Sequence, residues 1–271
     1  METDDLSTIA AVAGMSFVVA VGLHEHLGHA TTCALTTCDL TKLGAFYVDY
    51  RPGSLQGTAK WLVPATGPLV SLVVGVGSLL LFKLVRASSS LLTKVVLWHF
   101  FTVNLMIGAG YLLFSGFSGR GDLGHGTDEA LHGRRPEALW QILLIILGGL
   151  AYLAVMKNSV RMFASIVGGA GEQRVKRAQR LSLVAYISGV VVALAIGLLN
   201  PEGATILVVS AAMSSIGGTS GLGWMMLQFL DRKSAEEMPP SPPIKRNVRW
   251  IALAAIVVVG YAAIFGPTLT V

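Results

Sequence analysis

Long runs of apolar residues are the feature that most constrains this sequence. A transmembrane helix needs about 20 consecutive, mainly apolar residues, and the chain contains seven runs near that length. Only 13% of its 271 residues are charged, against about 25% in a soluble domain. We therefore predict an all-α polytopic membrane protein with about seven transmembrane helices. The spans are expected at residues 7–29, 61–82, 91–116, 138–156, 181–199, 204–230 and 250–268.

The distribution of basic residues predicts the orientation. If the N-terminus and the loops after the second, fourth and sixth spans share one side, that side carries 14 of the 20 lysine and arginine residues. Basic residues collect in cytoplasmic loops, so we expect a multi-pass protein of the bacterial inner membrane with a cytoplasmic N-terminus and an extracytoplasmic C-terminus. The net charge of +5 then reflects topology, and the expected partner is the lipid bilayer, with no nucleic acid.

The connection between the first two spans contains a segment with the composition of a β-strand. Residues Leu43–Tyr50 are rich in aromatic and β-branched side chains and precede the turn-forming residues Arg51–Ser54. We expect a short strand or hairpin here, lying along the membrane surface. Its free edge could hold an extended substrate peptide.

A cluster of ionisable residues closes the first span. Three of the six histidines and one glutamate fall within the six residues His24–His29. A helix starting near Ser7 places Glu25 about 27 Å along its axis, in the extracytoplasmic half of the bilayer. Ionisable groups at this depth are costly and mark functional sites. Two histidines beside a glutamate indicate a zinc site in which the glutamate is the general base.

The spacing of the two outer histidines differs from the usual zinc helix by one residue. The string reads H-E-x-x-G-H, whereas H-E-x-x-H puts the histidines one turn apart. Residues at i and i+5 are separated by about 140° around a regular helix. A π-type turn permitted by Gly28 would bring His24 and His29 onto one ion with Glu25 beside them. A regular helix would instead pair Glu25 with His29.

A third metal ligand is expected from the end of the third span, which lies on the same side of the membrane. Asp122 stands between Gly121 and Gly124, where a flexible backbone can fold back toward the bilayer. Its carboxylate would complete a tetrahedral set with His24 and His29, leaving the fourth place for water. The reserve candidates in the same segment are His125, Asp128 and His132.

These motifs occur in the order found in the site-2 protease family of intramembrane zinc metalloproteases, which the first 125 or so residues resemble. The likeness rests on His24, Glu25, Gly28, His29 and Ala30, on Ala65–Pro68, and on Gly121 and Asp122. The resemblance implies that His24, His29 and Asp122 bind zinc and that Glu25 activates water. It divides the chain into a site-2-protease-like three-helix core at 1–135 and four further transmembrane helices with basic cytoplasmic loops at 136–271.

Three departures separate the chain from that family. The helix motif has an extra residue, and Ser71 stands where the family often has asparagine. The 17 residues between Asn104 and Asp122 also make this spacing much longer than the corresponding asparagine-to-aspartate spacing of the family. The longer helix motif itself resembles that of the soluble dipeptidyl peptidase III family, which holds zinc with it.

Other polar residues in the spans are expected to have structural roles. His26 is interpreted as an interfacial residue or as an outer partner of the site. His99 and Asn104 are expected to form hydrogen bonds between helices, and Asn104 could also orient a substrate backbone. Cys33 and Cys38 are read either as small buried residues or as an extracytoplasmic disulfide.

The predicted function is hydrolysis of peptide bonds in membrane-embedded or membrane-proximal protein substrates by a zinc metallopeptidase. Two alternatives remain at this point. One is a metal or proton transporter in which the His, Glu and Asp side chains form an ion station or relay. The other is a membrane scaffold of the same family that has lost catalysis.

Overall fold

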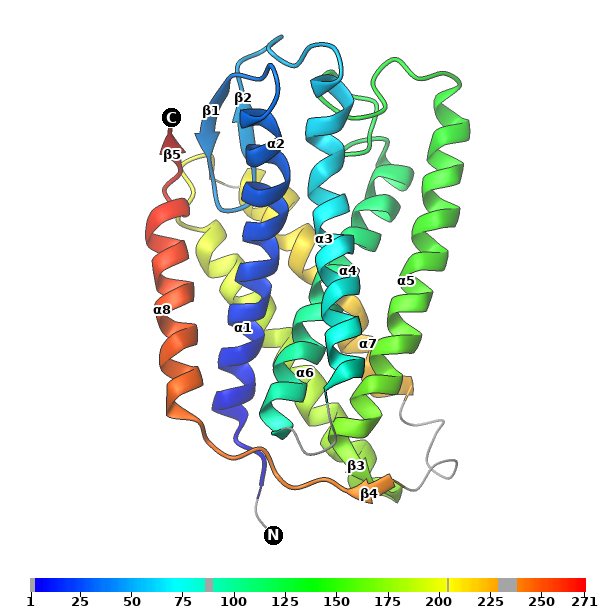
Figure 1. Ribbon diagram of the computed structural model, residues 1–271, viewed down its shortest axis with the longest axis vertical. Helices are drawn as coiled ribbons and strands as arrows, with labels where there is room; N and C mark the ends of the chain where they lie inside the picture. Colours follow the sequence, from blue (N-terminus) through cyan, green and yellow to red (C-terminus); the bar gives the residue numbers. More distant parts are fainter. Residues whose placement is uncertain (1–2, 86–89, 204, 229–237) are drawn as a thin grey trace.

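The computed structural model describes residues 3–85, 90–203, 205–228 and 238–271, with the backbone alone for 206–209 and 226–228. Its long helices run side by side, and the two termini lie at opposite ends of the bundle (Figure 1). The helical elements are α1 (Leu6–Gly22), the π-helix η1 (Leu23–Ala30), α2 (Thr31–Ala34), α3 (Ala59–Leu84), α4 (Leu91–Ser118), α5 (Glu137–Val167), α6 (Gly171–Gly197), the π-helix η2 (Ile206–Gly218), α7 (Ser220–Gln228) and α8 (Val248–Phe265). The strands are β1 (Leu40–Leu43), β2 (Val48–Tyr50), β3 (Gly168–Gly169), β4 (Met238–Pro240) and β5 (Leu269–Thr270).

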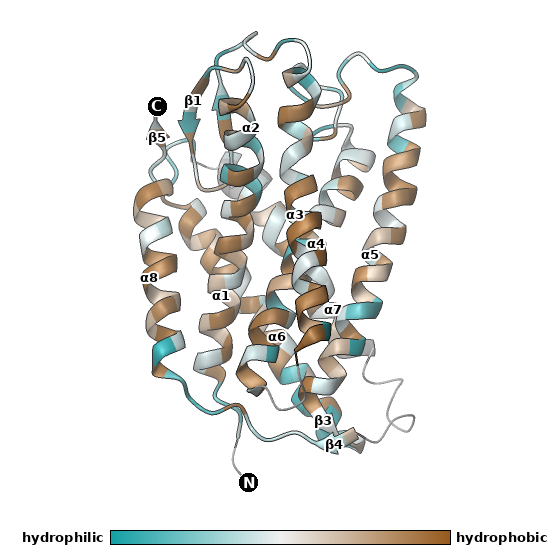
Figure 2. Cartoon of the chain, in the orientation of Figure 1, coloured by the Kyte–Doolittle hydropathy of each residue, from teal (hydrophilic) through white to brown (hydrophobic). Residues whose placement is uncertain are grey.

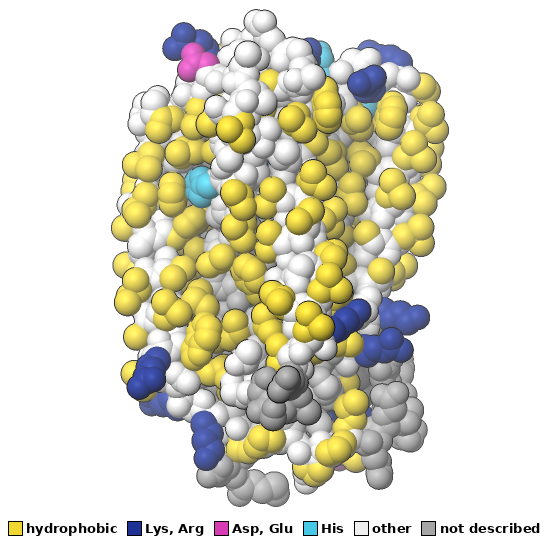
Figure 3. Space-filling view, in the orientation of Figure 1, with side chains coloured by type: hydrophobic (Ala, Val, Ile, Leu, Met, Phe, Trp, Pro, Cys, Tyr) yellow, Lys and Arg dark blue, Asp and Glu magenta, His cyan; other side chains and the backbone are white. Residues whose placement is uncertain are grey.

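Six helical stretches of the described residues are long and apolar enough to cross a membrane. They are Leu6–Ala34, Ala59–Leu84, Leu91–Ser118, Glu137–Val167, Gly171–Gly197 and Val248–Phe265, and they correspond to six of the predicted spans. Hydrophobic residues predominate along these helices, whereas polar residues are concentrated at both ends of the bundle (Figure 2). On the surface, apolar side chains form a broad band with lysine and arginine toward its two ends (Figure 3). The chain is thus a helical, polytopic membrane protein.

The remaining predicted span, 204–230, is divided into two elements. The π-helix η2 ends at Gly218, and α7 starts at Ser220 after a break at Thr219. Residues 204, 229 and 230 of that span lie outside the described residues. The small residues Gly217 and Gly218 lie at this break.

Polar caps and glycine set the ends of several helices. The side chains of Asp5, Ser90 and Asn247 accept hydrogen bonds from backbone amides of the first turns of α1, α4 and α8. Such caps satisfy amides that have no partner within the helix. Helix α4 ends at Ser118, and the φ of 68° at its cap residue Gly119 turns the chain away from the helix axis. This turn starts the loop that carries Asp122.

The predicted strand segment is a hairpin at the same end of the bundle as the C-terminus (Figure 1). Strand β1 pairs antiparallel with β2 on one side and with the C-terminal β5 on the other, which leaves β2 at the edge of the sheet. Cys33 and Cys38, just before β1, form a disulfide, so one of the two roles expected for them is present.

At the opposite end of the bundle, a buried ion pair ties three distant segments together. Asp4 accepts hydrogen bonds from Arg177 Nε and a terminal nitrogen of Arg177 at 2.9 and 2.7 Å, and from the amide of Ile244 at 2.9 Å. Arg177 also donates to the carbonyls of Val167, Ser241 and Pro242. Arg177 thus joins α6 to the N-terminus and to the segment before α8.

The Asp4–Arg177 pair predicts an acid-sensitive stability. Burial raises the pKa of Asp4, but the hydrogen bonds from Arg177 and Ile244, with the charge of Arg180, lower it below its ordinary value. A carboxylate whose pKa is lowered by folding stabilises the folded state at pH values above the pKa that it has in the unfolded chain. This contribution is lost as the pH falls toward the pKa of the folded state.

We therefore expect Asp4→Asn to lower the free energy of unfolding in detergent at pH 7 by about 3 kcal/mol, the cost of breaking a buried pair. The loss should shrink as the pH falls below about 4, the ordinary pKa of aspartate. Thermal unfolding across pH 3–7 measures both effects. The matched control is Asp49→Asn, which removes an exposed ion pair with Lys42 and should change stability by less than about 1 kcal/mol. Equal losses in both variants would contradict the prediction.

Candidate metal centre

The first membrane-spanning helix changes its winding at the H-E-x-x-G-H string. Residues Leu23–Ala30 form the π-helix η1, between α1 and α2 in one continuous helical stretch. A π-helix has more residues per turn than an α-helix, so residues five apart come to lie one above the other. Of the two arrangements left open by the sequence, the structure has the one in which His24 and His29 face the same point.

His24, His29 and Asp122 come together from two distant parts of the chain. Asp122 Oδ2 lies 3.0 Å from His24 Nε2 and 3.4 Å from His29 Nε2, and one ligand atom from each residue lies within 4.8 Å of the others. Both imidazoles are buried. These three residues form a group that could hold a metal ion.

Both imidazoles have a second partner on the nitrogen that faces away from the group. His29 Nδ1 donates a hydrogen bond to the carbonyl of Val63 at 2.8 Å, which directs Nε2 toward Asp122. His24 Nδ1 lies 3.1 Å from Ser71 Oγ. Such outer partners fix the tautomer and the ring orientation of histidine ligands. Ser71, noted in the sequence as a departure from the family pattern, is thus an orienting partner of His24.

Helix α3 approaches η1 through two glycines. A Cβ atom on Gly28 would lie 2.7 Å from the Cα of Gly67, and a Cβ on Gly67 would lie 2.7 Å from His24 Nε2 and would also collide with His29 Nε2. Thr66 Oγ1 donates to the carbonyl of Gly28 at 3.1 Å. The space between the two imidazole nitrogens therefore exists because residue 67 has no side chain.

The loop after α4 carries Asp122 back toward the bundle. Gly119 and Gly121 have φ angles of 68° and 87°, a region that glycine adopts without steric cost. The carboxylate of Glu129 accepts hydrogen bonds from the amides of Gly121 and Gly126, and Ser115 Oγ accepts one from the amide of Leu123. The loop around Asp122 is thus held by side chains on both sides of the ligand.

The electrostatic surroundings of Asp122 favour the ionised form of its carboxyl group. Burial raises the pKa of Asp122, but the neighbouring imidazoles of His29 and His24 outweigh burial and hold that pKa well below its usual range. Asp122 therefore remains a carboxylate, which is the form that binds a cation.

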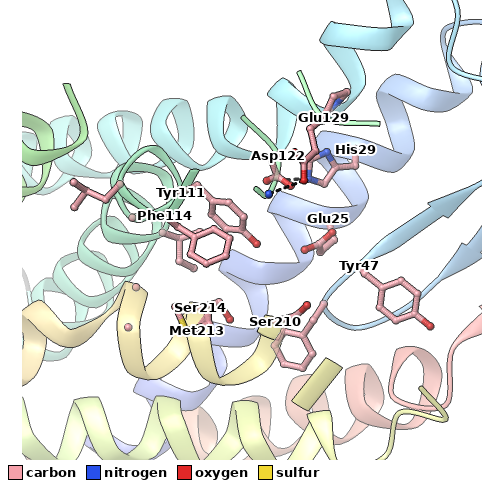
Figure 4. A pocket seen from close by; sticks show the side chains of 18 of the residues that line it. Glu25, His29, Tyr47, Tyr111, Phe114, Asp122, Glu129, Ser210, Met213 and Ser214 are labelled. Carbon is pink, nitrogen blue, oxygen red and sulfur yellow. Dashed lines mark hydrogen bonds and ion pairs between the residues drawn. The ribbon is translucent and has the colours of Figure 1, made fainter. Parts of the chain in front are cut away.

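A cavity of about 590 Å³ opens beside the three candidate ligands. Glu25, His29 and Asp122 line one side, and the hairpin and the η2–α7 break line the others. Figure 4 shows Glu25 directed into this space, with Ser210 and Ser214 of η2 across from it. Glu25 is 4% exposed. A carboxylate in this position can take a proton from a molecule held near the histidines.

Several other residues singled out in the sequence lie away from the ligand group. His26 stacks on Phe265 of α8, with ring centroids 4.1 Å apart. Among the described residues, neither ring nitrogen of His99 has a hydrogen-bond partner, so its predicted interhelical hydrogen bond is wrong. Asn104 donates within its own helix to Phe100, is fully buried and is not among the residues that line the cavity. Its Oδ1 has no partner among the described residues, so the predicted interhelical hydrogen bond of Asn104 is also wrong.

The reserve ligands do not join the group either. His125 Nδ1 donates to the carbonyl of Leu131, and His132 Nδ1 to that of His125. Asp128 lines the cavity with Glu129, but the group of possible ligands in the described part of the chain holds only His24, His29 and Asp122.

Sequence reasoning missed two residues that shape the site. Tyr111 stacks on His24, with ring centroids 4.4 Å apart, and lines the cavity. It stands in an apolar run that gives no sign of a site. Glu129 fixes the Asp122 loop by accepting hydrogen bonds from glycine amides. Its place in a glycine-rich segment of the sequence could have indicated this role.

Comparisons of the chain with protein-family models, with curated proteins and with solved structures found no match.

The glycine contact predicts a sharp effect on metal binding. Gly67→Ala should reduce bound divalent metal by at least about tenfold, as His29→Ala and Asp122→Ala should, because the new methyl group occupies the space between the ligand nitrogens. Elemental analysis of purified protein after dialysis against a limiting metal concentration measures this. The control on the same helix is Gly77→Ala, whose Cβ would meet no atom within 4 Å. Full metal content in Gly67→Ala would contradict the prediction.

Proposed function

We propose that this protein is an intramembrane zinc metalloprotease of the site-2 protease kind, which hydrolyses peptide bonds of membrane-embedded or membrane-proximal proteins. The observation that carries the proposal is the approach of His24 and His29 to Asp122 beside a cavity into which Glu25 points. Three ligands with an open side and a neighbouring carboxylate are the usual parts of a catalytic zinc site.

The donor set fits zinc in chemistry, and two of its three ligand-to-ligand distances match a tetrahedral zinc ion. Two imidazole nitrogens and one carboxylate oxygen suit a borderline-soft ion such as Zn²⁺. Ligand atoms about 2.0–2.1 Å from a tetrahedral zinc ion lie about 3.3 Å apart, and Asp122 Oδ2 lies 3.0 and 3.4 Å from the two imidazole nitrogens. The absence of a side chain at Gly67 leaves the room that an ion needs between them.

The protein's own groups then have distinct tasks. When bound, zinc would acidify a water molecule and polarise the substrate carbonyl. Glu25 accepts the proton of that water as it adds to the carbonyl carbon, and then returns the proton to the leaving amine. His24, His29 and Asp122 hold the ion, while Val63 and Ser71 orient the imidazoles.

The edge strand gives a way to bind an extended substrate. The carbonyl of Tyr47 and the amide of Arg51 face β1, since they bond to Gly44 and Asp39. Successive residues of a strand alternate in direction, so Val48 and Tyr50 present their amides and carbonyls to the open edge. Both residues line the cavity. A peptide that pairs there would be unwound beside Glu25, as hydrolysis requires, because helical amides are shielded by their own hydrogen bonds.

The same proposal includes the membrane topology. Helix α6 ends at the hairpin end of the bundle, and β4 pairs with β3 at the opposite end, so the η2–α7 segment would be a seventh crossing. The Cys33–Cys38 disulfide favours an oxidising compartment for the hairpin end. We infer a cytoplasmic N-terminus and an extracytoplasmic C-terminus in the bacterial inner membrane, in agreement with the basic residues.

Glu25→Gln separates proteolysis from metal binding. We expect this variant to keep its zinc and to lose at least about a thousandfold in kcat, because the general base is gone while the ligands remain. The measurement is cleavage of purified single-span membrane proteins and unfolded casein, alongside elemental analysis. Loss of zinc in Glu25→Gln would indicate that Glu25 is itself a ligand, as in an ion transporter. Wild-type protein that holds zinc and cleaves nothing would indicate a scaffold without catalysis.

Val48→Pro tests the edge strand. Proline removes one amide donor from the open edge without breaking a hydrogen bond to β1. We expect KM to rise by about threefold to tenfold with little change in kcat, the loss of one binding hydrogen bond. Val48→Ala keeps the amide and is the matched control for the lost side chain. An unchanged KM in Val48→Pro would rule out pairing of the substrate at this position.

A further inference from the structure

We propose that Tyr111 is a catalytic residue of this site, which donates a hydrogen bond to the oxyanion that forms on the substrate carbonyl. This inference rests on the proposed proteolytic function.

Tyr111 is in contact with the candidate metal centre. Its ring stacks on that of His24 with a centroid separation of 4.4 Å and an angle of 24° between the planes. Glu25 and Tyr111 together line the main cavity and also a smaller void next to it. In Figure 4 the tyrosine hydroxyl is directed into the cavity, on the side of Glu25 and Ser214. The phenol is therefore held near a ligand and beside the general base.

The hydroxyl of Tyr111 is free to bind a substrate atom. Within the described part of the chain it has no hydrogen-bond partner, whereas the hydroxyls of two other cavity tyrosines are engaged. Tyr47 bonds to Thr268 at 2.9 Å, and Tyr152 donates to the carbonyl of Gly218 at 2.9 Å. Tyr50 packs against the small apolar cluster around Cys33. A polar hydroxyl that faces an apolar cavity and lacks a partner is suited to a group that arrives with the substrate.

The reaction requires such a donor. When water adds to the peptide carbonyl, one water proton goes to Glu25 and the electron pair of the C=O π bond moves onto oxygen. The C–N bond then breaks, the amine takes the proton from Glu25, and the products are a carboxylic acid and an amine. Negative charge on the carbonyl oxygen is greatest between these two steps, and a donor placed in advance stabilises it selectively.

Tyr111 lines the cavity, whereas Asn104, the other polar residue of α4 considered for substrate contact, is not among its lining residues. Both residues belong to α4, but Asn104 lies among buried side chains whereas Tyr111 is two turns nearer to Asp122 and lines the cavity. The same helix therefore supplies a polar group to the site, from a place where it can reach substrate.

The test is Tyr111→Phe, which keeps the ring stacked on His24 and removes only the hydroxyl. We expect kcat for a cleaved peptide to fall by about 100-fold to 1000-fold with little change in KM, the usual effect of losing one oxyanion donor. Zinc content should stay at the wild-type level. The affinity for a phosphinic peptide, whose tetrahedral anion imitates the oxyanion, should fall by at least about tenfold. Tyr186→Phe, which removes a hydroxyl bonded to the carbonyl of Ile216, is the matched control.

Four results would overturn the inference, and they can be told apart. A kcat within about threefold of wild type in Tyr111→Phe, with Glu25→Gln inactive, would remove Tyr111 from catalysis and leave the proteolytic function standing. Loss of zinc in Tyr111→Phe would make Tyr111 a residue that positions His24. Wild-type protein that carries zinc and neither cleaves peptides nor binds the phosphinic peptide would overturn the proposed function as well. If Tyr111→Phe does not fold, Tyr111→His compared with Tyr111→Leu repeats the test, since only histidine supplies a donor, and equal kcat values in that pair would overturn the inference.

Discussion

The close contact between Gly28 of η1 and Gly67 of α3 is the constraint on which the candidate metal centre depends. It lets the two helices approach until a Cβ atom at either glycine would overlap the other helix or the imidazoles. Because α3 lies so near, the carbonyl of Val63 and the hydroxyl of Ser71 reach the outer nitrogens of His29 and His24. The ligand orientation is therefore a property of helix packing, in a membrane where small residues permit such approaches.

The π-helix η1 supplies the second half of the geometry. A regular helix would separate His24 and His29 by about 140°, so the two imidazoles could not face the same ion. The wider turn brings both imidazoles within reach of one carboxylate. A π-helix costs backbone stability and persists mainly at functional sites, and the surrounding contacts to α3 offset that cost.

Much of this arrangement could be predicted from the sequence because it follows from local rules. The length of the apolar runs predicted six helical spans that the structure contains. The glycines around Asp122 indicated a reversal of the chain. The strand-like segment is present as β1 and β2, although its central residues form the turn of the hairpin rather than one strand. What could not be predicted depends on contacts between distant segments. Nothing near Tyr111 in the sequence shows that its ring meets His24, and nothing near Arg177 shows that Asp4 lies beside it.

The sheet beside the cavity joins segments from the two ends of the chain. Strand β1 follows the first membrane-spanning helix, but its partner β5 follows α8, and Tyr47 in the hairpin bonds to Thr268 just before β5. Because β5 is synthesised after α8, the hairpin can pair with this third strand only after α8 has been made. The sheet whose β2 residues Val48 and Tyr50 line the cavity is thus completed only late in biogenesis, by a strand from the other end of the chain.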